Sequence, residues 1–383
     1  MVESVDTQDL KSCDHCGRVG SSPTPGTKAS NRTNKILEEI QGFFYLTMEA
    51  TTNPIGLLNA LRGIAAWMVC MFHSGFIIKP FYPELLPLLD WGQEGVYVFF
   101  VISGVVLPWS MEQGKYSFKN LDKFLLKRIV RLYPPFIISV LVFILGIWIM
   151  KDNRSFYDVE IIERFMDSVT FLVPFKESKW VIEVYWTLFV EFQYYIYLAL
   201  VFPFLASNKL SVRLMAYYGT LALTFLSHFF VPVHTKENLF FHLPVFALGF
   251  SLFLYYKKNI SKLEFWSGVI AALCVGLFNI YDQLVLGTHI TIVAGCTFLA
   301  IYFIKRGPKW LNFIGDVSYS YYLFHLFFVS FIYGYFYHES QDGKLVWVVF
   351  AAIQVYAVLG AWIMYELIEK PSLAWTKKIR YRS

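Results

Sequence analysis

The chain has 383 residues, of which 56% are hydrophobic and 16% are charged, and its mean hydropathy is +0.49. These values exclude an ordinary soluble domain and are typical of a protein with several membrane-spanning segments. The formal net charge is only +5, and basic residues fall mostly in short segments between apolar runs, so no nucleic acid partner is expected.

The N-terminal part of the sequence, residues 1–47, is polar and is predicted to form a disordered or surface-associated tail. A membrane domain is predicted over residues 48–383. The CDHC motif that begins at Cys13 is not followed by a second Cys or His pair at the spacing of a zinc site. No metal site is therefore expected.

Ten apolar segments follow, each long enough or nearly long enough to cross a bilayer as an α-helix. The turns between them are mostly short, as in a helical bundle. We therefore predict an all-α polytopic membrane protein with about ten transmembrane helices in one bundle. The predicted segments are approximately 57–78, 93–110, 132–150, 184–205, 214–232, 239–256, 265–281, 288–304, 313–333 and 345–366.

Lysine and arginine are unequally distributed between alternate loops, and this bias predicts the orientation of the bundle. One set of loops carries 19 of these residues and the alternate set carries 8. Because positively charged loops stay in the cytoplasm, the first set and both chain termini are predicted to be cytoplasmic. The first set comprises 111–131, 206–213, 257–264, 305–312 and 367–383.

Two polar side chains, Arg62 and His73, interrupt the first predicted span. An arginine at the centre of a membrane helix costs about 2.5–3.5 kcal/mol, so a function for it is expected. At about 100° and about 1.5 Å per residue, the two side chains share one helix face and lie roughly 16 Å apart. The alternative is an arginine that snorkels to the interface and a histidine that bonds to a carbonyl.

Three further polar residues fall at membrane depth in the predicted topology. Glu191 in the fourth span is placed at the depth of His73, where a carboxylate would fix the tautomer of the imidazole; the alternative is a structural pairing. Asp316 in the ninth span is placed at the depth of Arg62, either as an ion-pair partner or as a helix N-cap. His325 lies near mid-membrane, either as a catalytic residue or as a hydrogen-bonded core residue.

A basic cluster, Lys127, Arg128 and Arg131, is predicted at the cytoplasmic mouth of the third span. It suits a phosphate ligand, because guanidinium and phosphate groups pair in bidentate geometry. The alternative is anchoring to the anionic membrane surface. Ser103 and Gly104 in the second span are interpreted as a small pair that lets helices approach closely.

Seven segments of the chain, spread over most of residues 55–375, follow an order that resembles the acyltransferase-3 family of integral membrane O-acyltransferases. These segments are NALRGIAAWMVCMFH, GQEGVYVFFVISGVVL, FLLKRIVRLYPPF, YWTLFVEFQYY, FHLPVFALGF, IGDVSYSYYLFHLF and YELIEKPSLAW. The resemblance implies that Arg62 and His73 are the essential pair of the family and that acyl-CoA is the acyl donor. It also implies donor contacts from Arg128 and Arg131.

The expected activity is transfer of an acyl group, acetyl from acetyl-CoA above all, to a hydroxyl of a cell-surface or lipid-linked saccharide. O-antigen, lipopolysaccharide or another surface polysaccharide is the expected acceptor class, and the inner membrane of a bacterium is the expected location. No permanently bound cofactor is expected. If acyl handover needs an extracytoplasmic domain, a separate partner chain is expected to supply it.

In the expected mechanism, the CoA head binds the basic cluster that contains Lys127, Arg128 and Arg131. His73 takes the proton of the acceptor hydroxyl or carries the acyl group itself, and Glu191 orients it. The sequence has no Walker loop, GxSxG elbow or HExxH motif, so the common soluble-enzyme chemistries are not expected. The alternative functions are a proton-coupled transporter or flippase and a non-catalytic scaffold, although the internal repeats of many transporters are missing.

Overall fold

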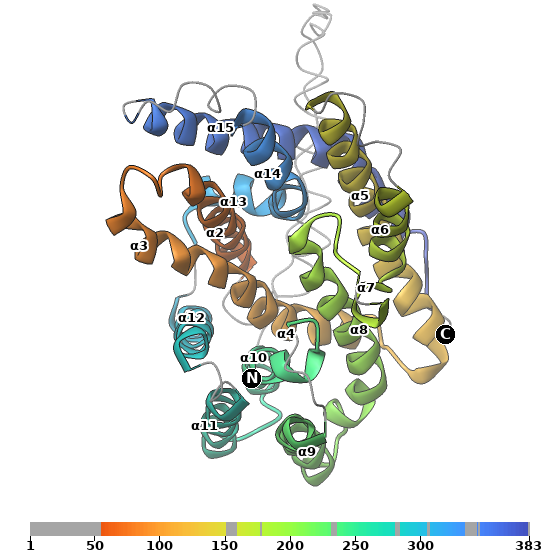
Figure 1. Ribbon diagram of the computed structural model, residues 1–383. Helices are drawn as coiled ribbons and strands as arrows, with labels where there is room; N and C mark the ends of the chain where they lie inside the picture. The colour runs from red at the N-terminus through yellow and green to blue at the C-terminus, as the bar shows by residue number, and fades with distance from the viewer. Residues whose placement is uncertain are drawn as a thin grey trace, which may run out of the picture. The chain divides into compact units, whose positions relative to one another are not determined.

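The computed structural model describes residues 55–150, 159–176, 178–230, 236–279, 284–304, 307–333, 343 and 345–381. The described residues form helices joined by short turns and contain no strand, so the predicted all-α class is confirmed (Figure 1). The predicted tail and its CDHC motif lie outside the described residues, and the domain boundary at residue 47 stays a prediction.

Each of the ten predicted apolar segments coincides with an α-helix, because long apolar runs are local features of the sequence. The helices are α2 (Ile55–Ser74), α4 (Gly95–Gln113), α5 (Leu121–Met150), α8 (Trp186–Leu205), α9 (Leu210–Phe230), α10 (Leu239–Tyr256), α11 (Lys262–Asn279), α12 (Leu284–Phe303), α14 (Ser318–Ile332) and α15 (Val346–Met364). Shorter helices are α3 (Leu86–Asp90), α6 (Val159–Thr170), α7 (Val173–Lys176), α13 (Lys309–Asp316) and α16 (Lys370–Thr376). Single 3-10 turns cover Gly75–Ile77, Pro83–Leu85, Trp91–Glu94, Phe118–Asn120 and Glu183–Tyr185.

Among the described residues, six continuous helical stretches are long and apolar enough to cross a membrane. Two further apolar helical stretches, Thr288–Phe303 and Ser318–Ile332, are shorter. The chain is therefore an integral membrane protein, while the count of ten spans and the cytoplasmic termini stay predictions. The six stretches are Leu57–Ile77, Pro83–Gln113, Phe118–Ile149, Glu183–Leu205, Leu239–Tyr256 and Val346–Thr376.

Two predicted helix ends were wrong, because charged residues were interpreted as the start of a loop. The third span was expected to start at residue 132, but α5 starts at Leu121 and continues through Pro134 and Pro135. Proline is tolerated in membrane helices when neighbouring groups satisfy the freed carbonyls. The last span was expected to end at residue 366, but a π-helical turn, Tyr365–Glu369, joins α15 directly to α16. Both corrections place charged residues on helices inside the bundle.

The helix α4 runs between α2 and α10 and packs closely on both (Figure 1). Against α10 the contact is backbone to backbone: a Cβ atom on Gly104 would lie 2.2 Å from the carbonyl oxygen of Phe246. A Cβ atom on Gly249 would lie 2.0 Å from the carbonyl oxygen of Val101. Gly104 is therefore a packing residue, as the Ser103–Gly104 pair predicted.

Substitution of Gly249 by alanine is expected to destabilise the protein by about 1–3 kcal/mol, because the new methyl group forces α4 and α10 apart. Gly219→Ala is the matched control, since no atom lies within 4 Å of its added Cβ. Gly219→Ala in the middle of α9 is expected to leave the stability of the protein unchanged or to raise it slightly, because alanine is a better helix former than glycine. Unfolding in SDS–detergent mixtures measures both changes. Equal stability of the two variants would contradict the backbone contact.

On its other side, α2 touches α13 at a second glycine pair. A Cβ on Gly63 would lie 2.9 Å from the amide nitrogen of Gly315, and a Cβ on Gly315 would lie 2.1 Å from the carbonyl oxygen of Asn59. This approach leaves no room for side chains between the helices. The close approach of α2 and α13 places the start of α14, which follows α13 directly, beside Arg62 on α2.

Candidate functional site

The two polar residues of α2 both face α14. The Nε atom of Arg62 donates a hydrogen bond to Oγ of Ser318 at 3.1 Å. The imidazole of His73 lies beside that of His325, with 5.2 Å between the ring centroids. Both side chains are half-buried. The predicted common face therefore points into the bundle, and the snorkelling alternative for Arg62 does not describe its position.

Arg62 belongs to a group of five charged side chains that we call the arginine cluster: Arg62, Arg128, Arg131, Glu191 and Glu369. Arg62 interacts electrostatically with Arg131 and with both carboxylates. Arg128 interacts with Arg131 and Glu191. The cluster draws its members from α2, α5, α8 and the π-helical turn. The cluster contains three guanidinium groups and two carboxylates, and the carboxylate of Asp316 on α13 also interacts with Arg62.

The cluster is held in place by neutral hydrogen bonds and aromatic rings. Glu369 is only 2% exposed, and one of its oxygens accepts from the backbone N–H of Ser320 at 3.2 Å and from its hydroxyl at 2.7 Å. The guanidinium of Arg128 lies over the rings of Phe124 and Tyr195, 5.1 and 5.5 Å from their centroids. These contacts hold the side chains of Glu369 and Arg128 in position within the cluster.

Two donor atoms of the cluster lack a protein partner. The Nε atoms of Arg128 and Arg131 are enclosed and make no hydrogen bond. Unpaired donors of this kind are costly in a buried site, and an anionic ligand would satisfy them. Lys127 is turned toward the chain's C-terminal segment, where its ammonium lies 4.3 Å from the centroid of the Tyr381 ring. Burial raises the pKa of the Tyr381 hydroxyl, so it stays neutral there.

Glu191 does not lie where the sequence placed it. Its carboxylate accepts a hydrogen bond from the hydroxyl of Tyr195, one helical turn away, and its charge interacts with the arginines. Within the described ranges no hydrogen bond joins Glu191 to His73. The predicted carboxylate–histidine pair is therefore absent there, and the alternative of a pairing with other helices describes Glu191 better.

Asp316 lies at the end of α13 and not at the N-cap of α14, which is Val317. Its carboxylate accepts a hydrogen bond from Nδ2 of Asn59 at 2.7 Å and interacts electrostatically with Arg62. The N-cap alternative was wrong, and the expected charge interaction with Arg62 is present without direct contact of the two groups. Asp316 thus supports the α2–α13 contact.

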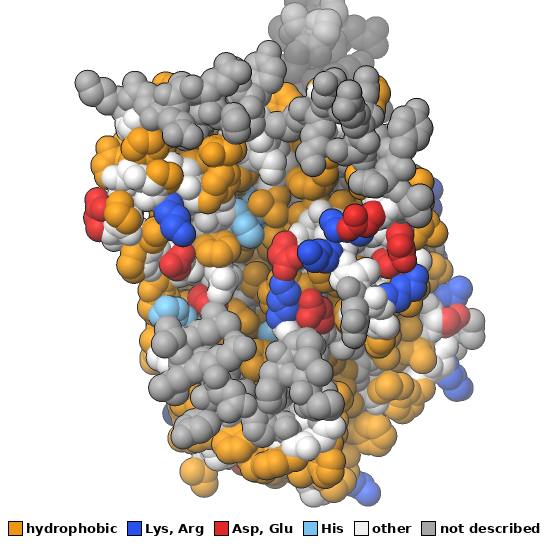
Figure 2. All heavy atoms as spheres, viewed as in Figure 1, with side chains coloured by type: hydrophobic (Ala, Val, Ile, Leu, Met, Phe, Trp, Pro, Cys, Tyr) orange, Lys and Arg blue, Asp and Glu red, His pale blue; other side chains and the backbone are white. Residues whose placement is uncertain are grey.

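The His73 end of the site is aromatic and uncharged apart from one exposed pair. His73 packs edge-on against Phe72, with centroids 4.8 Å apart. The hydroxyl of Tyr322 donates to the carbonyl of Val184 at 3.0 Å and lies 2.8 Å from Oγ1 of Thr187. Glu183, which interacts electrostatically with His73, is exposed and pairs with Lys236. On the face in Figure 2, histidine side chains lie between charged ones.

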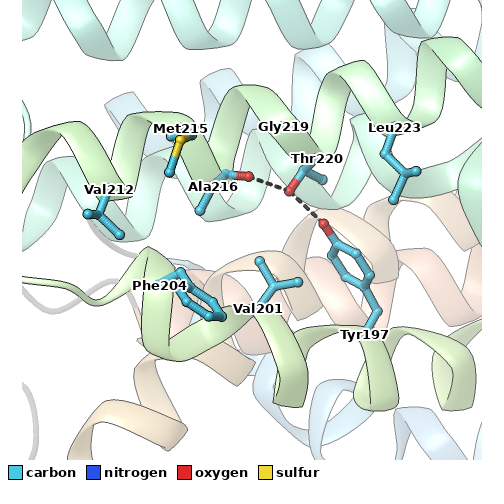
Figure 3. Close-up of a pocket in the computed structure, with 9 residues that line it drawn as sticks. All are labelled: Tyr197, Val201, Phe204, Val212, Met215, Ala216, Gly219, Thr220 and Leu223. Carbon is cyan, nitrogen blue, oxygen red and sulfur yellow. Dashed lines mark hydrogen bonds between the residues drawn. The ribbon is translucent and has the colours of Figure 1, made fainter.

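A separate apolar cavity of about 280 Å³ lies between α8 and α9 (Figure 3). Its polar contacts are a hydrogen-bonded chain from the hydroxyl of Tyr197 to Oγ1 of Thr220 and on to the carbonyl of Ala216. None of the residues that the sequence singled out lines this cavity. The lining residues are Tyr197, Val201, Phe204, Val212, Met215, Ala216, Gly219, Thr220 and Leu223.

Three residues that position the charged groups were not predicted from the sequence: Ser318, Tyr195 and Glu369. The first two are neutral and gave no signal. Glu369 lies in the segment YELIEKPSLAW, where an acidic residue next to a long apolar run was a detectable signal. It was overlooked because the segment was interpreted as a cytoplasmic tail.

The sequence model of the acyltransferase domain of the acyltransferase-3 family matches residues 55–366, which is most of the chain. The match contains both polar residues of α2, the basic residues of α5 and the histidine of α14. Searches of curated proteins and of solved structures found no match. The chain therefore belongs to the acyltransferase-3 family and is a membrane acyltransferase.

Proposed function

We propose that the protein moves an acyl group, the acetyl group of acetyl-CoA in the simplest case, to a hydroxyl of a cell-surface or lipid-linked saccharide in a bacterial cytoplasmic membrane. The arrangement on α2 supports this proposal. Arg62 lies in a cluster that contains three guanidinium groups, and His73 lies roughly 16 Å farther along the same helix face. A phosphate-bearing donor suits the first site, and a neutral hydroxyl acceptor suits the second.

The donor binds through its phosphates to the arginine cluster. The free Nε atoms of Arg128 and Arg131 supply directed donors, and Arg62 supplies a third guanidinium. The length of the extended pantetheine arm of CoA is comparable to the distance between Arg62 and His73. The thioester carbon is thereby presented near His73, while the charged head stays at the cluster.

At the thioester, His73 acts as general base. It takes the proton of the acceptor hydroxyl as the oxygen attacks the carbonyl carbon, so that a C–O bond forms and the C–S bond breaks. The proton then passes from the imidazole to the departing thiolate, which leaves as the CoA thiol. An apolar setting keeps the imidazole neutral between turnovers, as a base requires.

The proposal is tested with purified protein in liposomes, acetyl-CoA as donor and dodecyl maltoside as a membrane-embedded saccharide acceptor. Free CoA thiol and acetylated maltoside, detected by thiol reagent and mass spectrometry, are expected in equal amounts, with slower CoA release when water is the acceptor. A protein that releases no CoA under either condition is not an acyltransferase of this kind. Uptake of the saccharide without CoA release would indicate a transporter.

Arg131→Gln is expected to raise the KM for acetyl-CoA roughly tenfold to hundredfold, because a hydrogen bond to a charged phosphate is worth about 1.5–3 kcal/mol. The KM for S-acetylpantetheine, which lacks the nucleotide and its phosphates, is expected to change little. Lys257→Gln, which removes an ammonium paired with Glu112, is the matched control. Equal losses with both donors would contradict phosphate binding by Arg131.

A further inference from the structure

His325 on α14 is completely enclosed, and its hydrogen bonding fixes its tautomer. The Nδ1 atom lies 2.7 Å from the carbonyl oxygen of Tyr322. Because a carbonyl oxygen only accepts, Nδ1 carries the proton of the neutral imidazole. The Nε2 atom then holds a lone pair, so it can act only as an acceptor.

That Nε2 atom has no hydrogen-bond partner, although it is shielded from solvent. An unpaired buried acceptor costs about 1–3 kcal/mol, so a use for it is expected. The ring next to it is His73, with 5.2 Å between centroids and 39° between planes. Two imidazoles joined by one N–H···N bond of about 2.9 Å have centroids roughly 5 Å apart. The separation of the two rings therefore matches that of a pair joined by such a bond.

The carboxylate that interacts with His73, that of Glu183, and the one that the sequence predicted as its partner, that of Glu191, both have other partners. Glu191 is bonded to Tyr195 in the arginine cluster. Glu183 is exposed and paired with Lys236. A neutral imidazole is also the cheaper partner at this depth, because it adds no buried charge when His73 is neutral.

We propose that His325 is the positioning residue of His73. Its Nε2 atom accepts the N–H of one His73 nitrogen, which leaves the lone pair of the other nitrogen free for the acceptor hydroxyl. When His73 takes the hydroxyl proton, the same bond stabilises the imidazolium, and His325 keeps its own Nδ1 proton throughout. This inference rests on the proposed function, because it assigns a partner to the base named there.

Two substitutions test the roles of the two nitrogen atoms of the His325 ring separately. His325→Asn keeps an amide N–H that can donate to the carbonyl of Tyr322 but has no atom in place of Nε2. His325→Gln extends an amide oxygen to the level of Nε2, where it can accept from His73. With acetyl-CoA and dodecyl maltoside, His325→Asn is expected to lower kcat roughly tenfold to hundredfold. Loss of the partner that orients a metal-binding histidine has an effect of this size. The KM for acetyl-CoA is expected to stay unchanged.

His325→Gln is expected to recover part of this loss. His289→Asn is the matched control, because the His289 ring packs at a tilt against Trp91, with centroids 4.1 Å apart, and forms none of the contacts of His73. This variant is expected to keep the wild-type kcat. The double variant of His73→Ala with His325→Asn is expected to lose no more activity than His73→Ala alone, since His325 acts through His73.

Three results would overturn the inference: a wild-type kcat for His325→Asn, no recovery in His325→Gln, or additive losses in the double variant. The melting temperature of each variant shows whether a lower kcat reflects unfolding. His325→Asn and His325→Gln are compared when their melting temperatures are equal. Failure of the proposed function looks different. In that case His73→Ala itself would transfer acetyl groups at the wild-type rate.

Discussion

Replacement of His73 by alanine is expected to lower the kcat of acetyl transfer by about 10²–10⁴-fold, the range of general acid–base catalysis by one side chain. The KM for acetyl-CoA is expected to stay within a few-fold of the wild-type value, because the phosphates bind at the other end of α2. Steady-state release of CoA thiol from acetyl-CoA, with dodecyl maltoside as acceptor, measures both quantities.

The fold is expected to survive this change. His73 is half-buried in the last turn of α2 and forms none of the glycine contacts that hold that helix. His289→Ala is the control for loss of an imidazole elsewhere. Near-normal transfer by His73→Ala would remove His73 from the mechanism. Acetyl label that stays on wild-type protein and is absent from His73→Ala would instead identify His73 as an acyl carrier.

The helices were predictable because the signals for them are local. A run of apolar residues indicates a helix without reference to the rest of the chain, and each of the ten predicted runs contains an α-helix. Among the described residues, six helical stretches are long and apolar enough to cross a membrane. The same holds for the common face of Arg62 and His73, which follows from about 100° per residue within one helix. The positions of the helices and the shared face therefore agree with the structure, although two helix ends do not.

The partners of the charged residues were not predictable in this way. Glu191 and His73 were assigned to the same depth, but depth does not say which helices are neighbours or how far a side chain reaches. Long arginine side chains carry their charge away from their own Cα atoms. Tyr195 lies one turn from Glu191 on α8, but Arg128 belongs to α5, and its interaction with Glu191 depends on packing between distant segments.

The arginine cluster also shows why the end of the last span matters. With the span ended at residue 366, Glu369 belonged to a tail and its charge needed no explanation. The π-helical turn carries it into the bundle, where it accepts two hydrogen bonds from Ser320 and faces Arg62 and Arg131. A buried carboxylate between two arginines is the counter-charge that allows them to stay inside a membrane protein.

Glu369→Gln is therefore expected to destabilise the protein by about 1–3 kcal/mol, because it removes a buried negative charge that acts on Arg62 and Arg131 without a contact ion pair. The glutamine oxygen can still accept from Ser320, so the change isolates the charge. Unfolding in SDS–detergent mixtures measures the loss. Glu366→Gln is the matched control, because Glu366 pairs with Lys370 in a part-exposed (i,i+4) bridge worth about 0.5 kcal/mol.

The same variant tests whether the cluster binds an anion. Without Glu369, the cluster keeps its three guanidinium groups but loses one negative charge, so its net charge becomes more positive by one. Added CoA should then stabilise Glu369→Gln more than it stabilises the wild-type protein, because its phosphates replace the missing counter-charge. Equal stabilisation of both proteins by CoA would place the donor's phosphates outside the cluster. If Glu369→Gln lowers the free energy of unfolding no more than Glu366→Gln does, then Glu369 does not neutralise the arginines.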